Sequence, residues 1–185
     1  MLRGFLITLV VLACGCDSVI YGAGTVYVWN GTEQLVELQS QGRTPFSTKL
    51  RPKTGQLFND VVAGDYTVSA RRGPDKAKQL PVTVHKELLT IINADGVGCF
   101  ARANVFGMYS KGVDPVKLSE LYSEQPVIQM QGMVDVLPGE RLPAAAPRKP
   151  YSANTFLRIV VVPCDLMANE GRAEEKVTDF IKRLR

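Results

Sequence analysis

The chain has 185 residues, a net charge of +4 and a single histidine. So small a net positive charge does not indicate a nucleic-acid-binding protein. A chain of this length buries an adequate hydrophobic core without a scaffold of several disulfides. A single histidine excludes, within one chain, a catalytic zinc site with two or three histidines and a blue-copper centre.

The N-terminus has the pattern of an export signal. Arg3 precedes an apolar run from Phe5 to Ala13. The run is about nine residues long, which suits a signal peptide and is too short to span a bilayer, since spanning takes about 20 helical residues. We therefore predict a signal peptide over residues 1–16, followed by a short tether over residues 17–24.

A small residue directly before a cysteine, after such a run, resembles the bacterial lipobox. The resemblance implies that the cysteine carries palmitate or a similar lipid, and that the lipid holds the protein at a membrane of the cell envelope. Two cysteines compete. Cys14 follows the better aliphatic residues, whereas lipidation of Cys16 would leave an even pair, Cys99 and Cys164, in the mature chain. An ordinary secretory signal, which would leave the protein soluble, is the alternative.

Residues 25–110 are expected to form an antiparallel β-sandwich. Strand-like runs recur about every 8 to 14 residues and are broken by Gly, Pro and Asn, as in all-β domains. The pair Asn30-Gly31 is a strong hairpin signal, so residues 25–29 and 34–40 are expected to be paired. The other predicted strands cover residues 57–62, 65–72, 79–87, 87–96 and 101–109.

Gly64, Tyr66 and Val68 form a Gly-x-Tyr-x-Val sequence after an apolar strand. This corner resembles that of the prealbumin-like sandwiches, which include transthyretin-like and carboxypeptidase-regulatory-like domains. The resemblance implies an Ig/prealbumin-like sandwich of a kind that mostly serves as a binding, assembly or spacer module. A fold of this kind does not by itself imply an activity.

Residues 111–185 are expected to be an extension packed on the same domain. Asp114 and Pro115 suit the N-cap and first positions of a helix, which predicts a short helix near residues 114–125. Two further strands are expected, one after Pro126 and one in the apolar run before Cys164.

A proline-rich loop over residues 138–150 separates these two strands, and the chain ends in a predicted amphipathic helix over residues 172–185. Val177, Ile181 and Leu184 repeat at helical spacing along one face of this helix. We expect that face to pack on the sandwich; the alternative is a helix that meets a partner or a membrane surface.

Cys99 and Cys164 are the candidate disulfide. Both lie beside strand-like runs, and an exported domain meets an oxidising compartment. A bridge between them would close a loop of about 65 residues and stabilise the fold by up to a few kcal/mol. Two separately buried thiols are the alternative.

Tyr27 and Trp29 are the candidate binding face. They share one side of the strand over residues 25–29, with Val26 and Val28 on the other. If the sheet is covered on one side only, an outward aromatic face would be a binding patch for sugar or peptide. The alternative is that Trp29 anchors the core.

No catalytic constellation emerges. The chain lacks the nucleophile-elbow, S-x-x-K, P-loop and dinucleotide-binding motifs, and nothing brings His85 to a serine or fixes two carboxylates at a catalytic separation. We expect no enzyme activity, metal or cofactor. The predicted function is a lipid-anchored binding or assembly module facing the periplasm or the exterior, with an envelope protein as partner and no nucleic acid. The alternatives are a glycan- or cell-wall-binding module and a hydrolase with an unrecognised site.

Overall fold

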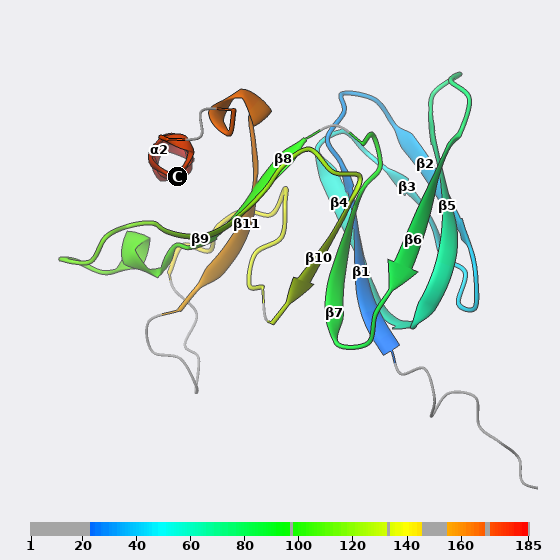
Figure 1. Ribbon diagram of the computed structural model, residues 1–185, viewed down its shortest axis with the longest axis horizontal. Coiled ribbons are helices and arrows are strands. Elements are labelled where there is room, and N and C mark those ends of the chain that lie inside the picture. The colour runs from blue at the N-terminus through cyan, green and yellow to red at the C-terminus, as the bar shows by residue number, and fades with distance from the viewer. Residues whose placement is uncertain (1–22, 97, 133, 146–154, 169–170, 185) are drawn as a thin grey trace, which may run out of the picture.

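The computed structural model describes residues 23–96, 98–132, 134–145, 155–168 and 171–184. Strands make up 49% of the protein and one helix lies near its C-terminus, which confirms the mainly β prediction (Figure 1). The elements are β1 Ala23–Asn30, β2 Val36–Gln41, β3 Ser47–Leu50, β4 Thr54–Val62, β5 Gly64–Arg72, β6 Lys78–Val84, β7 Leu88–Asn93, β8 Cys99–Asn104, β9 Lys117–Tyr122, β10 Val127–Gln131, β11 Leu157–Val162, the 3₁₀ turns η1 Phe106–Tyr109 and η2 Cys164–Leu166, and α2 Ala173–Arg183.

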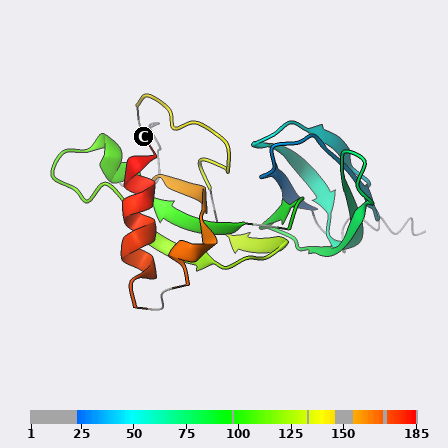
Figure 2. The same ribbon diagram turned by 90° about the horizontal axis from the view of Figure 1, so that it is seen from above.

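The strands form three sheets. Sheet 1 has the order β10-β7-β1-β4, sheet 2 the order β3-β2-β5-β6, and sheet 3 the order β11-β8-β9. Neighbouring strands are antiparallel except β1 and β7, which are parallel. Sheets 1 and 2 lie at one end of the molecule, and sheet 3 lies at the other end beneath α2 (Figure 2).

Sheets 1 and 2 share a hydrophobic core. Alternate residues of a strand point to one face, so β5 contributes Tyr66, Val68 and Ala70 to this core, in agreement with the alternation in its sequence. Val26 and Val28 of β1 face them from sheet 1 and are fully buried. The side chain of Gln129 on β10 donates a hydrogen bond of 2.6 Å to the carbonyl of Thr83 on β6, which links the two sheets along one side.

The opposite face of sheet 1 is covered as well. Tyr27 and Trp29 of β1 and Ile91 of β7 pack in a second core with Phe100 of β8 and Ile159 of β11. Sheet 1 is therefore the middle layer, with sheet 2 on one side and sheet 3 on the other, and β1 is buried on both faces.

The far face of sheet 3 carries the C-terminal helix. Val177 and Ile181 of α2 are fully buried against this sheet. Cys99 of β8 and Cys164 of η2 form a disulfide with their Cα atoms 5.2 Å apart, which confirms that pairing. The helix is confirmed too, although it covers Ala173–Arg183 rather than residues 172–185.

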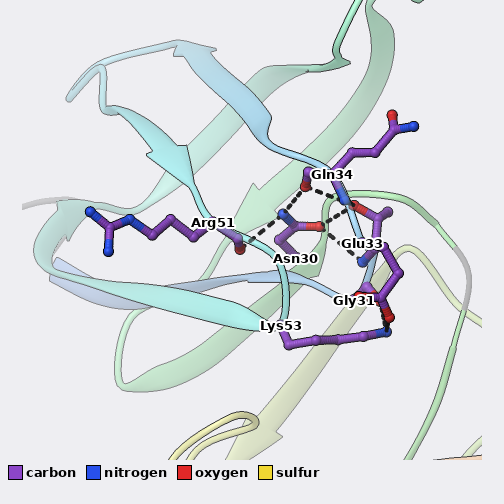
Figure 3. A network of polar contacts seen from close by, with 7 residues as sticks. Asn30, Gly31, Glu33, Gln34, Arg51 and Lys53 are labelled. Carbon is purple, nitrogen blue, oxygen red and sulfur yellow. Dashed lines mark hydrogen bonds and ion pairs between the residues drawn. The ribbon is translucent and has the colours of Figure 1, made fainter.

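The predicted hairpin at Asn30-Gly31 is wrong. β2 pairs with β3 and β5 of sheet 2 and not with β1, so the chain crosses between sheets at this point. The buried amide of Asn30 donates to the carbonyls of Gln34 (2.8 Å), Leu50 (3.0 Å) and Arg51 (3.0 Å). Its oxygen accepts from the hydroxyl of Thr32 at 2.7 Å (Figure 3). These side-chain hydrogen bonds hold the chain at the crossing, where a β1–β2 hairpin would have used backbone hydrogen bonds.

The predicted helix near residues 114–125 is also wrong, because the strand β9 occupies the middle half of that segment. The β8–β9 register shifts between Arg102 and Ala103, which leaves Ser119 as an extra residue on β9. This bulge turns Leu118 and Leu121 toward the same core, at a spacing that resembles that of a helix. Asp114 accepts a hydrogen bond from the backbone of Val116 at 3.3 Å and forms a turn there instead of a helix cap.

The expected division at residue 110 differs from the sheet boundaries. The strand expected over residues 101–109 is β8 followed by η1, and β8 pairs with β9 and β11 in sheet 3. β10, which belongs to the expected extension, pairs with β7 in sheet 1. The two expected segments therefore exchange strands, because the pairing partners of β7 and β8 lie far along the chain.

Candidate functional site

β4 is an outer strand of sheet 1 and the most promising surface for a partner. It spans nine residues and, among the residues that the structure describes, it pairs only with β1. An outer strand presents backbone N–H and C=O groups that can pair with another chain. Leu57, near the middle of β4, is 43% exposed.

A groove of about 260 Å³ lies beside Leu57. Leu88 and Leu89 line it from β7, and Val134 and Leu137 line it from the segment that follows β10. The remaining lining residues are Gly24, Thr25, Glu87 and Gly132. The groove is thus mostly apolar, and Glu87 is its one charged lining residue among those described.

A β-bulge adjoins the groove. Gly24 is opposite Val61 and Val26 is opposite Phe58, so two residues of β4 stand opposite Thr25 alone. One of the two, Asp60, has a φ of 59°, which aspartate tolerates better than most residues do. Bulges are common at sheet edges and next to binding sites, where they end regular pairing and re-aim side chains.

Tyr27 forms a rigid support behind the edge. Its ring lies across Gly55, where a Cβ atom would come within 2.0 Å of the phenol oxygen. The phenol donates a hydrogen bond of 2.5 Å to the carbonyl of Pro138. Burial raises the pKa of Tyr27, and the negative charge of Glu140 raises it further, so the phenol stays a neutral donor. Glu140 itself accepts a hydrogen bond of 2.8 Å from the backbone of Leu137 in the groove wall.

The predicted binding face of Tyr27 and Trp29 is not a surface. The two residues are 3% and 4% exposed, because sheet 1 is covered on both faces rather than on one. The ring of Trp29 lies against Gly139, where an added Cβ would be 2.4 Å from it. The alternative, in which Trp29 anchors the core, agrees with this packing.

The predicted lipidation residues Cys14 and Cys16 lie outside the described residues. His85 is exposed just after β6. Several of the scattered acids hold structure: Asp65 accepts from the hydroxyl of Thr83 at 2.7 Å, and Asp135 accepts from the backbone of Leu157, also at 2.7 Å. In the described part of the chain, no three His, Cys, Asp or Glu residues are grouped so that they could hold a metal ion.

Sequence reasoning missed Leu57 and the groove. The available signal was the pair Leu57-Phe58, because adjacent residues of a strand point to opposite faces. Phe58 packs toward the core between sheets 1 and 2, so Leu57 must face the other way. Whether that second face is covered depends on the segment after β10, which the local pattern does not reveal.

Within the residues described, no helix is long and apolar enough to cross a membrane. In comparisons with known proteins, no family model matches the chain, no curated protein matches it, and no solved structure matches its fold.

Proposed function

We propose that this protein is a membrane-anchored envelope lipoprotein that acts as a non-enzymatic binding or assembly module. The observation that carries the binding role is the outer strand β4, which pairs with β1 on one edge and with no other described strand, and the exposed side chain of Leu57 beside an apolar groove. Such an edge suits an extended segment of a partner protein, which adds to the sheet through backbone hydrogen bonds and places a side chain in the groove.

The proposed address rests on the leader and on the disulfide. The charged and apolar pattern over residues 1–16 supports export and lipidation. The Cys99–Cys164 disulfide agrees with an oxidising compartment such as the periplasm. Sheets 1 and 2, packed face to face, support the further proposal of an Ig/prealbumin-like sandwich.

Lipidation is tested by mass spectrometry of the protein extracted from its own envelope. If Cys14 carries the lipid, Cys14→Ser abolishes acylation and membrane retention while Cys16→Ser keeps both; if Cys16 carries it, the results are reversed. Recovery of an unacylated chain in the soluble fraction from the unaltered gene would contradict a lipid anchor.

Partner binding is tested by affinity capture of the full-length protein from detergent-solubilised envelopes. Leu57→Lys places a charge on the edge and in the groove, so the partner recovered with the unaltered protein should be lost. Val113→Lys is the matched control, because Val113 is 54% exposed and does not line the groove. Retention of the same partner by Leu57→Lys, or equal loss in both variants, would count against the β4 edge.

A glycan- or cell-wall-binding module is the second candidate function. Burial of Tyr27 and Trp29 removes the aromatic face on which it partly depended. A pocket formed partly by the basic turn between β5 and β6 still favours an anionic ligand. For a hydrolase, we find no supporting contact between His85 and a serine, or between two carboxylates, among the hydrogen bonds of the described residues.

A further inference from the structure

A second pocket lies at the other end of the core between sheets 1 and 2. β1 runs from Gly24, which lines the groove, to Asn30, a distance of roughly 20 Å at the rise of an extended strand. At the Asn30 end, the backbone of Ala94 donates a hydrogen bond of 2.9 Å to the carbonyl of Trp29. A pocket of about 120 Å³ opens beside Ala94, too small for a long chain.

The floor of this pocket is apolar and buried. Val36, Ala70 and Ala94 line it and are 2%, 5% and 4% exposed. They belong to the core that the two sheets share. A charged group seated here would therefore have low-dielectric material on one side, where Coulomb attraction is stronger than in water.

The walls carry positive charge at positions where the strand pattern calls for apolar residues. Arg72 continues the inward-facing series of β5, and Lys78 begins the inward-facing series of β6. Lys76, from the turn between these strands, completes the lining. Two adjacent strands thus independently direct a cation toward the same end of the core.

The acids at the pocket offset these cations only in part. Asp75 pairs with Arg72 at 3.1 Å, and Asp95 is the other acid in the lining. Lys76 and Lys78 form no ion pair with any described residue. The amine of Lys78 lies above the turn at Gly96, where an added Cβ would be 2.3 Å from it. With three cations and two acids, the lining keeps an excess of positive charge.

We infer that this pocket binds a phosphate group carried on a small ester. The phosphate meets the ammonium groups of Lys76 and Lys78 and the guanidinium of Arg72, and the ester's organic part lies on the apolar floor. Charge-assisted hydrogen bonds of this kind are about twice as strong as neutral ones. The inference is independent of the β4 edge, because none of these residues lines the groove.

The test is an amide NMR titration of the full-length protein, in a maltoside detergent, with glycerol 3-phosphate at constant ionic strength. We expect saturable shifts at the amides of Lys78, Ala94 and Gly96. Lys78→Gln should weaken binding at least tenfold, while Lys111→Gln, the matched control on an exposed turn, should leave it unchanged. Leu57→Lys should also bind normally, so failure of the edge proposal and failure of this one are distinguishable.

A second experiment, co-sedimentation with phosphatidylglycerol vesicles, distinguishes a lipid headgroup from a soluble phosphate ester as the ligand. If the protein binds the vesicles and Lys78→Gln abolishes that binding, the phosphate belongs to a lipid headgroup. If Lys78→Gln weakens binding of glycerol 3-phosphate but the protein does not bind the vesicles, the phosphate is free or carried on a polymer. The inference is overturned if no saturable shift occurs at these amides, or if the Lys78 and Lys111 variants lose affinity equally.

Discussion

Asn30 holds the two large sheets together at the point where the chain passes between them. Its amide group donates to three backbone carbonyls, and its oxygen accepts from Thr32. Asn30→Leu should lower the free energy of unfolding by at least about 2 kcal/mol, because buried carbonyls lose their donors. Asn30→Asp should be as damaging, since a carboxylate cannot donate. Urea unfolding measures both; wild-type stability in the aspartate variant would show that shape alone matters here.

Glu37 gives stability a dependence on acid pH. The carboxyl pairs with Lys49 at 2.7 Å and with Arg71, and hydrogen bonds from these cations, Lys49 first, lower the pKa of Glu37 from 4.5 to about 2. The depressed pKa means that this contribution is present above pH 4.5 and is lost as the pH falls toward 2. Glu37→Gln should therefore be less stable than the unaltered protein at neutral pH and equally stable near pH 2. A difference that is independent of pH would refute the ion-pair explanation.

Arg158 is a half-buried cation that forms no ion pair with a carboxylate in the described part of the chain. Its Nε and Nη1 atoms are buried and form no hydrogen bond with any residue that the structure describes, and burial lowers the pKa of the guanidinium. Unsatisfied buried donors cost about 1–3 kcal/mol each, so Arg158→Met should raise the melting temperature. Arg158→Lys, which keeps the charge, should not. Calorimetry of the two variants decides the matter, and a lower melting temperature for the methionine variant would mean that Arg158 has a stabilising role.

At the scale of the element, the disulfide fastens the C-terminal part of the chain. It joins β8 to η2, shortly before α2, across a separation of 65 residues. In the chain-entropy account a loop of this length contributes up to about 4 kcal/mol. The variant with both Cys99→Ala and Cys164→Ala should unfold at lower urea concentration by this order of magnitude. Added dithiothreitol should destabilise the unaltered protein and leave the double variant unchanged; sensitivity of the double variant would contradict the assignment.

Elements with a regular local pattern were predictable from the sequence. The alternation in β5 and the helical spacing of Val177 and Ile181 are set by residues near one another, and both elements formed as expected. β9 was not predictable, because a bulge at Ser119 gives two leucines of a strand a helix-like spacing. The hairpin prediction at Asn30 was wrong because the local sequence does not show which groups the side chain of Asn30 contacts. Its amide donates to the carbonyls of Leu50 and Arg51, which lie about 20 residues further along the chain.

At the scale of the whole molecule, the stacking of three sheets decides which residues are available for binding. A partner protein was predicted from the sequence, but the strand that would meet it was not identified. Tyr27 and Trp29 were the wrong residues, because their exposure depends on whether sheet 3 and the segment before Gly139 cover sheet 1. Leu57 remains exposed on the same face because it lies on the outer strand, beyond that cover.

The central claim is that a partner protein binds at the β4 edge, and site-specific photo-crosslinking in intact cells tests it most directly. A photoreactive amino acid replaces Leu57 in one variant and Val113, an exposed control residue outside the groove, in another. We predict a discrete crosslinked species from position 57 and none from position 113. No crosslink from position 57, or the same species from both positions, would contradict the claim.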